Sequence, residues 1–216
     1  MNFVFVLNGG FDREYDLEFF KNYQYIICID GGYVHFQKLK LGIKPDFIIG
    51  DFDSIGNMDI KKQNQEKTKV IYKDNQDETD AEFALKYILK TFSDKKINKL
   101  DFIYSISTSR FDHSLCNTFL LKQIPENIKA RMLSKTQEIF ILRKEVIIKN
   151  RVGKTLSIIP ITNVKGLEIK GCKWNLDNTD ANFGFIGGIS NIIEKNEAEI
   201  SLKEGECVII ISYELE

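Results

Sequence analysis

Two aspartates separated by one residue form the most chemically suggestive feature of the sequence. Asp51 and Asp53 follow a short apolar run at residues 47–49 and the turn residue Gly50. In an extended segment, residues at i and i+2 lie on one side of the backbone, with Phe52 turned the other way. Carboxylates held that close repel unless a cation separates them, and Mg²⁺ takes one or two protein carboxylates together with water and substrate phosphate. A loop of turn-forming aspartates is the alternative. The position after a predicted strand, where α/β sheets bind ligands, favours a Mg²⁺ site.

A second acidic segment covers residues 73–80. Thr79 and Glu82 have the spacing of a capping box, which predicts that a helix begins at Thr79. Asp80 would then lie in the first helical turn, where a carboxylate stabilises the helix dipole without any further role. Three more acidic residues crowd the same positions, more than capping requires. We therefore favour a third metal-site carboxylate here, either Asp80 or Asp77.

Residues 105–113 form a third polar segment, which follows a predicted strand and opens a predicted helix. Backbone amides at such a junction, together with Arg110, could hold a polyphosphate. Asp112 fits a helix N-cap as well as a functional carboxylate. His113 alone is more often a structural hydrogen bonder than a catalytic base, and His35 is interpreted as structural.

The segment Gly171-Cys172-Lys173-Trp174-Asn175-Leu176 contains the only tryptophan of the chain. A lone tryptophan usually belongs to the core. Trp174, however, lies between Lys173 and Asn175 just after a glycine, which suits an aromatic wall for a planar, cationic ligand.

The elements that must position these residues alternate between strands and helices in the first part of the chain. Strands are predicted at residues 3–7, 25–29, 47–49, 70–72 and 100–104, and helices at 17–23, 33–41, 58–65, 79–92 and 112–122. The last helix would place Leu115, Cys116, Phe119 and Leu120 on its core face. Two Gly-Gly pairs follow strands, where phosphate-binding turns occur. This alternation predicts a three-layer α/β domain with a mostly parallel sheet.

The pattern changes near residue 130, after which short β-type runs follow one another without helices. They are predicted at residues 138–142, 145–149, 155–160, 164–169, 189–193, 198–202 and 206–212. This spacing is typical of an antiparallel β-sandwich. We therefore expect two domains, an α/β catalytic domain at 1–132 and a β-sandwich at 133–216.

The composition excludes several classes of protein. With 216 residues, 43% hydrophobic and 28% charged, the chain can bury one large core or two small ones. A net charge of −1 provides no field to recruit nucleic acid or anionic membrane. The four cysteines lie far apart without a Cys-x-x-Cys pair, which favours reduced core thiols. Because the chain shows no signal peptide and no apolar run of membrane-spanning length, we expect a cytoplasmic protein.

Five motifs, taken in order, resemble those of the thiamine pyrophosphokinase family over nearly the whole chain. They are Asp30-Gly31-Gly32, Pro45-Asp46 with Gly50-Asp51-Phe52-Asp53-Ser54, Gln76-Asp77 with Thr79-Asp80, Arg110-Phe111-Asp112-His113, and Lys173-Trp174-Asn175-Leu176. The resemblance implies an α/β domain followed by a β-sandwich, a homodimer, and transfer of pyrophosphate from ATP to thiamine with release of AMP.

The resemblance also implies roles for individual residues. It implies Mg²⁺ at Asp51, Asp53 and Asp80. For a carboxylate that takes the hydroxyl proton, the sequence does not separate Asp77, Asp80 and Asp112. ATP would lie near Asp30, Gly31, Gly32, Arg110, Asp112 and His113. Thiamine would lie between subunits, near Gln76 of one and Trp174, Ser190 and Asn191 of the other.

One departure from the family pattern concerns the loop before Arg110. The family commonly has Gly-Gly there, whereas this chain has Thr108-Ser109, and β-branched threonine disfavours a positive φ. The path of the ATP-phosphate loop therefore stays open. Two rival functions are a Mg²⁺-dependent nucleoside triphosphate hydrolase and a non-catalytic nucleotide or thiamine sensor. The hydrolase does not need Trp174 at a shared interface, and the sensor does not need the aspartates.

Overall fold

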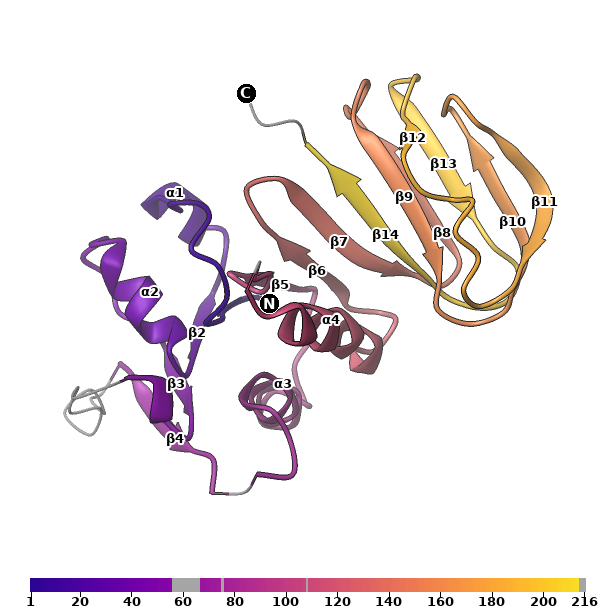
Figure 1. Ribbon diagram of the computed structural model, residues 1–216. Helices are drawn as coiled ribbons and strands as arrows, with labels where there is room; N and C mark the ends of the chain where they lie inside the picture. Colours follow the sequence, from indigo (N-terminus) through magenta and orange to yellow (C-terminus); the bar gives the residue numbers. More distant parts are fainter. Residues whose placement is uncertain (56–66, 75, 108, 214–216) are drawn as a thin grey trace. The chain divides into compact units, whose positions relative to one another are not determined.

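The computed structural model describes residues 1–55, 67–74, 76–107 and 109–213 (Figure 1). They form two compact units, Met1–Ser134 and Lys135–Glu216, which are treated separately below. The helix predicted at residues 58–65 lies outside the described residues.

Six parallel strands build the sheet of the first unit. They are β1 (Asn2–Val6), β2 (Tyr25–Ile29), β3 (Phe47–Gly50), β4 (Lys69–Tyr72), β5 (Lys99–Ile103) and β6 (Lys129–Leu133). Their order is β6-β5-β1-β2-β3-β4, and all five neighbouring pairs are parallel. The inner strands β1, β2 and β3 consist mostly of buried apolar residues, because both faces of a parallel sheet are covered.

Helices cover both faces of this sheet, as the alternating pattern predicts. They are α1 (Leu17–Phe20), α2 (Gly32–Lys38), α3 (Asp80–Thr91) and α4 (Phe111–Leu120), and α2 and α3 lie on opposite sides of the sheet (Figure 1). Val4 of β1 belongs to a buried cluster with Phe36 of α2. Its neighbour Phe3 points the other way and packs edge-on against Phe92 at the end of α3. The predicted three-layer α/β architecture is confirmed.

The strand order gives the sheet one functional edge. β1 lies between β2 and β5, so the chain adds strands outward from β1 to β4 on one side and then crosses back to add β5 and β6 on the other. In parallel sheets of this kind, ligands bind beyond the carboxyl ends of the strands near such a reversal. The segments that follow β2, β3, β4 and β5 therefore meet at the edge where the sequence places its polar motifs.

The second unit is an antiparallel β-sandwich, as predicted. One layer has the order β12-β9-β14-β7 and the other β11-β10-β13-β8. A buried apolar cluster fills the space between them, with Ile158 and Ile209 from one layer and Leu167 and Ile200 from the other. The strands are β7 (Gln137–Leu142), β8 (Glu145–Lys149), β9 (Thr155–Pro160), β10 (Val164–Lys170), β11 (Leu176–Ala181), β12 (Asn191–Ile192), β13 (Glu197–Ser201) and β14 (Cys207–Ser212).

Two of the observed strands, β6 and β11, are not predicted from the sequence. The strand β6 carries two charged residues in five, and Met132 is its only fully buried side chain, so its sequence reads as a connection. The strand β11 has the sequence LDNTDA, mostly exposed at the edge of its layer, and it lacks apolar alternation. The strand predicted at 189–193 shrinks to β12 because Ser190 has a φ of 60°. Both β6 and β11 bury few side chains, and apolar alternation is what periodicity detects.

The predicted core face of α4 is wrong. Leu115 is 42% exposed and Phe119 43% exposed, and Cys116 is also exposed, so the expectation of a core thiol fails there. Leu120, at the end of the helix, is buried as predicted. Helical periodicity identifies an apolar face but does not establish that another element covers it. The other three cysteines are buried, and all four are free thiols.

Within the described residues, no helix combines the length and the apolar character needed to cross a membrane.

Candidate active site

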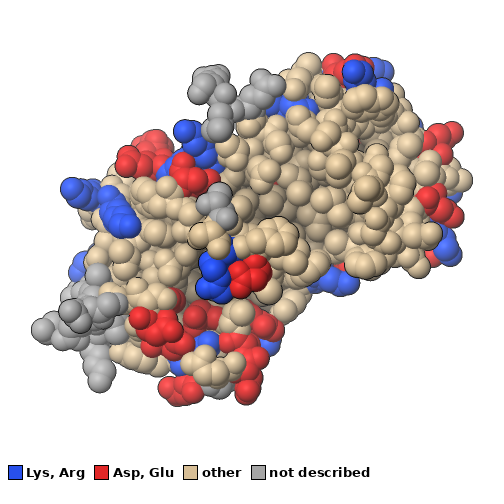
Figure 2. Space-filling model, in the orientation of Figure 1, with Lys and Arg blue, Asp and Glu red and all other residues tan. Residues whose placement is uncertain are grey.

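Three carboxylates from consecutive strand ends converge at the carboxyl edge of the parallel sheet. Asp30 follows β2, Asp51 follows β3, and Asp53 begins a short 3₁₀ turn. Each offers one oxygen, and the three oxygens lie within 4.8 Å of one another. We call these residues the acidic group. Figure 2 shows acidic side chains gathered over the part of the first unit that carries β4 and α3.

The backbone brings Asp51 and Asp53 together by a route that the sequence does not predict. Phe52 adopts a left-handed φ of 66°, so the segment turns and is not extended. The Phe52 ring packs edge-on against Tyr72, which holds this turn against the end of β4. Asp53 then donates its N–H to Asp51 Oδ1 over 3.3 Å. The predicted proximity of the carboxylates therefore arises from a turn anchored by an aromatic side chain.

Asp30 is the buried member of the acidic group. It is only 6% exposed, and its Oδ1 has no hydrogen-bond partner among the described residues. Its φ of 44° is left-handed, a conformation that aspartate tolerates better than most residues. A buried carboxylate oxygen without a partner is costly unless a cation compensates it. This oxygen points to a cation between the three carboxylates.

The glycines after Asp30 allow this close packing. A Cβ on Gly31 would lie 2.3 Å from the Asn8 side chain, and one on Gly32 would lie 2.0 Å from the carbonyl oxygen of Val6. Any side chain at either position would push α2 away from β1. These glycines therefore fix where the turn after β2 places Asp30.

The first Gly-Gly pair is engaged differently. Gly9 donates its N–H to the carbonyl of Tyr104 over 2.7 Å, and Gly10 donates to Ile106 over 2.8 Å. These two amides therefore bind backbone carbonyls of the same chain and not a phosphate. Burial lowers the pKa of His35, and the neutral ring lies with Nε2 2.9 Å from the Gly9 carbonyl oxygen. His35 thus supports the turn, in keeping with its structural interpretation.

Gln76 contacts the acidic group directly. Its Nε2 donates to Asp51 Oδ2 over 3.1 Å, and this hydrogen bond lowers the pKa of Asp51. Asp51 is therefore ionised at neutral pH. Ser54 likewise donates its hydroxyl to Asp53 Oδ1 over 2.9 Å.

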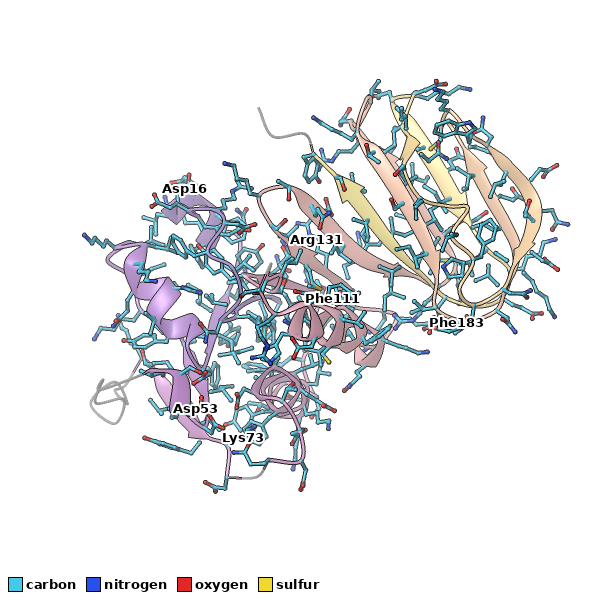
Figure 3. All side chains as sticks on the ribbon, viewed as in Figure 1. Asp16, Asp53, Lys73, Phe111, Arg131 and Phe183 are labelled. Carbon is cyan, nitrogen blue, oxygen red and sulfur yellow. The ribbon has the colours of Figure 1, made fainter. Side chains whose placement is uncertain are left out.

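Lys73 is a buried cation at the same edge, and the sequence analysis missed it. Its side chain is 3% exposed, and Nζ lies 3.2 Å from Asp80 Oδ1. The same ammonium donates to the carbonyl of Glu78 over 2.8 Å, and its backbone N–H donates to the carbonyl of Gly50 over 3.0 Å. Figure 3 shows Lys73 and Asp53 at the same end of the unit. Its position just after a strand, like that of Asp51, was the available signal.

Asp80 lies beside the acidic group and outside it. Burial raises its pKa, and the negative charges of Asp51 and Asp30 raise it further, against the opposing effect of Lys73. These effects of Asp51 and Asp30 place Asp80 near both of them, but its ion-pair partner is Lys73. Asp77 is exposed and also lies outside the acidic group. Thr79 caps α3 as predicted, since its hydroxyl accepts the N–H of Glu82 over 3.2 Å.

Arg110 and its neighbours form a compact, exposed ion pair. The guanidinium donates to both oxygens of Asp112, over 3.0 and 2.8 Å, and also contacts His113 Nε2. The Arg110 hydrogen bonds lower the pKa of Asp112 to about 2. Arg110 itself is the N-cap of α4, so Asp112 is not the cap and lies in the first turn. Thr108 lies outside the described residues.

In the second unit, Trp174 is 54% exposed and does not belong to the core. The ammonium of Lys173 lies 4.7 Å from the centre of its ring. Ser190 has a left-handed φ of 60°, and its N–H donates to the hydroxyl of Ser157 over 3.1 Å. Asn191 is 5% exposed and binds the backbone of Trp174. The residues that the sequence analysis groups here therefore do lie together.

The acidic group fits a hard divalent cation. It offers only oxygen ligands, one of them buried and unpaired, and Asp51 is ionised at neutral pH. Oxygen ligands with open positions for water and phosphate are the preference of Mg²⁺. The arrangement can therefore hold a metal–phosphate complex at the edge of the sheet.

Comparison with known proteins gives two matching family models. The model described as "Thiamin pyrophosphokinase, catalytic domain" matches residues 17–132, and "Thiamin pyrophosphokinase, vitamin B1 binding domain" matches residues 144–207. The first covers more than half of the chain.

Individual relatives agree with the family models. The chain is 29% identical over 174 residues to thiamine pyrophosphokinase 1 of Oryza sativa subsp. japonica, covering 76% of this chain and 65% of the relative. It is 29% identical over 164 residues to thiamine pyrophosphokinase 2 of Arabidopsis thaliana, covering 70% of this chain and 60% of the relative. The chain thus spans a little under two thirds of the length of these plant proteins.

Solved structures share the fold along the whole chain. Thiamine pyrophosphokinase from Bacillus subtilis superposes with a TM-score of 0.83 at 27% identity, covering 100% of both chains. The yeast thiamin pyrophosphokinase superposes with a TM-score of 0.80 at 19% identity, covering 98% of this chain and 86% of that one, which supports the fold alone.

Proposed function

Because the chain belongs to the thiamin pyrophosphokinase family, as its ordered motifs predict, we propose that it transfers pyrophosphate from ATP to thiamine. The products are thiamine pyrophosphate and AMP. The observation that carries this proposal is the acidic group, whose buried Asp30 oxygen without a described partner favours a bound cation. A metal-binding edge on a parallel sheet is suited to a polyphosphate substrate.

The acidic group would hold Mg²⁺ through Asp30, Asp51 and Asp53. When bound, Mg²⁺ neutralises charge on the phosphate oxygens. Asp80 is the third metal ligand implied by the sequence, and here it is held by Lys73. We propose that Asp80 borders the metal site and that Lys73 balances part of its negative charge when ATP is absent.

The reaction needs alignment more than covalent help from the protein. The primary hydroxyl oxygen of thiamine forms a bond to the β-phosphorus of ATP. The bond between that phosphorus and the α,β-bridging oxygen breaks, and AMP leaves with this oxygen. The hydroxyl proton passes to a carboxylate, for which Asp77, Asp80 and Asp112 are the candidates. Catalysis then consists of orientation and charge neutralisation.

ATP is proposed to lie across the carboxyl edge of the sheet. Arg110 offers a planar fork suited to phosphate, and its current partner Asp112 shows that the fork takes a bidentate anion. Asp30, Gly31, Gly32 and His113 complete the proposed nucleotide site. A phosphate of ATP would replace Asp112 on the guanidinium.

Thiamine is proposed to lie between two subunits of a homodimer. Gln76 of one subunit, already bonded to Asp51, would face the ligand from the metal side. Trp174 of the partner subunit, with Ser190 of the partner subunit, would supply an aromatic wall. An exposed indole attracts a cationic ring such as the thiazolium. A cytoplasmic enzyme acting on these small molecules, with no nucleic-acid or membrane partner, is part of the same proposal.

The test is an incubation of the protein with ATP, Mg²⁺ and thiamine, in which AMP and thiamine pyrophosphate are quantified. The proposal predicts equal amounts of both products, and no AMP when thiamine is omitted. Nucleotide breakdown without thiamine would indicate a hydrolase. Binding of nucleotide or thiamine without any turnover would indicate a sensor. The Asp51→Asn variant shows whether product formation belongs to this site.

A further inference from the structure

The Asn191 side chain forms a bidentate clamp on the backbone of Trp174. Its Oδ1 accepts the N–H of Trp174 over 3.1 Å, and its Nδ2 donates to the Trp174 carbonyl over 2.6 Å. The same Oδ1 accepts the N–H of Ile192 over 2.9 Å. One side-chain amide therefore satisfies both backbone groups of Trp174, as a neighbouring strand would.

This use of Asn191 leaves little capacity for a ligand. An asparagine amide offers two acceptor positions on oxygen and two N–H donors. Both acceptor positions and one donor are occupied by the chain, and the residue is only 5% exposed. The sequence-based assignment of Asn191 to direct thiamine contact therefore does not fit its geometry.

The indole of Trp174 is held from its backbone and not from its ring. The side chain is 54% exposed, and its described ring contact is the ammonium of Lys173, itself an exposed side chain. The backbone around it is fixed instead, because Lys173 donates its N–H to the carbonyl of Ile192 over 2.8 Å and Cys172 forms a β-bridge with Ile193. The clamp completes this attachment at the tryptophan itself.

We propose that Asn191 is a positioning residue: it fixes the direction of the Trp174 indole and thereby prepares the aromatic wall for a planar cationic ligand. This inference rests on the proposed function, in which Trp174 contacts thiamine. A prepared wall binds better because the ordering of an exposed aromatic side chain does not then oppose ligand binding.

The test uses the fact that Trp174 is the only tryptophan, so indole fluorescence reports on this position alone. Asn191→Ala removes both bonds to Trp174, whereas Asn191→Asp keeps the acceptor and replaces the donor by a carboxylate oxygen that repels the Trp174 carbonyl. Indole anisotropy and acrylamide quenching are measured without ligand, and thiamine and ATP binding are measured by calorimetry. Ile200→Val, in the core of the same unit, is the control for general loss of stability.

We expect lower anisotropy and stronger quenching in Asn191→Ala, with thiamine affinity reduced roughly tenfold for the two lost hydrogen bonds and ATP affinity unchanged. Asn191→Asp should show a change of the same sign, and Ile200→Val no change in anisotropy. Unchanged anisotropy and thiamine affinity in a folded Asn191 variant would overturn the proposal, and Asn191→Asp serves if Asn191→Ala does not fold. Lower anisotropy with unchanged thiamine affinity would support the clamp and remove Trp174 from the thiamine site.

Discussion

At the scale of single residues, the site depends on charges that the fold leaves unbalanced. Asp51 and Asp53 lie beside the buried Asp30, so three carboxylates share a small volume. Asp80, which lies beside them, forms an ion pair with Lys73. The three carboxylates therefore repel one another in the folded protein, and binding of a cation relieves this repulsion.

The first prediction concerns Asp51 and Asp53, the two less buried members of the acidic group. Asp51→Asn or Asp53→Asn should reduce turnover roughly 10²-fold or more, because each removes a ligand and a charge from the proposed metal site. Both variants should fold, since neither side chain is deeply buried. The rise in melting temperature on adding Mg²⁺, which reports metal binding directly, should disappear. Activity within tenfold of wild type in both variants would remove these residues from the metal site.

The second prediction concerns Asp30. Its substitution should raise the free energy of unfolding, whereas most substitutions of buried residues lower it. Asp30→Asn keeps the shape and tolerates the left-handed backbone, but it removes a buried charge whose Oδ1 has no described partner. The free energy of unfolding without Mg²⁺ should therefore rise, by about 1 kcal/mol. Asp101→Asn is the matched control, because Asp101 is fully buried but paired with Arg131 and Tyr23. The free energy of unfolding of Asp101→Asn should fall by on the order of 2 kcal/mol.

Chemical denaturation of both variants, with and without Mg²⁺, measures this contrast. A loss of stability in Asp30→Asn similar to that of Asp101→Asn would mean that the Asp30 carboxylate is already compensated by the protein.

At the scale of elements, the site is built from the segments that follow β2, β3 and β4 and from the first turn of α3. Thr79 caps that turn and Lys73 ties it to β3 through Gly50. The helix therefore delivers Asp80 to the edge of the sheet at a fixed position.

The third prediction tests this delivery. Thr79→Ala removes the N-cap of α3 and should cost about 1 kcal/mol in the free energy of unfolding. Because Asp80 is the next residue, turnover should also fall, by more than the loss of stability alone explains. Thr91→Ala, at the other end of α3, changes a residue with no capping role; it should leave turnover unchanged and should not lower the free energy of unfolding, because alanine is the better helix former. Equal activity in the two variants would show that the cap does not position Asp80.

The sequence predicts elements best where the determinants are local. The N-cap at Thr79 and the apolar spacing along α3 lie within one segment, and both are confirmed. The predicted closeness of Asp51 and Asp53 is confirmed for a different reason, because Phe52 turns the chain. Asp30 joins them only because β2 and β3 are neighbours in the sheet, a tertiary fact that spacing along the chain does not contain. The prediction of a core face on α4 is wrong for the same reason, because spacing along the chain does not show whether another element covers the helix.

At the scale of the whole molecule, the proposal divides the site between two copies of the chain. The metal-binding carboxylates belong to the first unit, and Trp174 belongs to the second. If each site combines the first unit of one subunit with the second unit of its partner, lesions in the two units should complement each other.

The fourth prediction uses this complementation. Asp51→Asn and Trp174→Ala, each inactive alone, are unfolded and refolded together in equal amounts. Random pairing makes about half of the dimers mixed, and each mixed dimer has one site without a lesion. Roughly a quarter of wild-type activity should return. Continued inactivity, with mixed dimers verified by two affinity tags, would mean that each site is built within one chain.

The strand order also governs how the protein emerges during synthesis. β1 is made first, yet it lies inside the sheet between β2 and β5. Once residue 72 has been made, β2, β3 and β4 can assemble on one side of β1, while its other edge waits for residues 99–103. At about 5–20 residues per second, translation of that interval takes roughly one to six seconds. An open strand edge recruits strands from other chains. The speed at which the ribosome reads codons 73–98 therefore sets how long the nascent chain is exposed to misassembly.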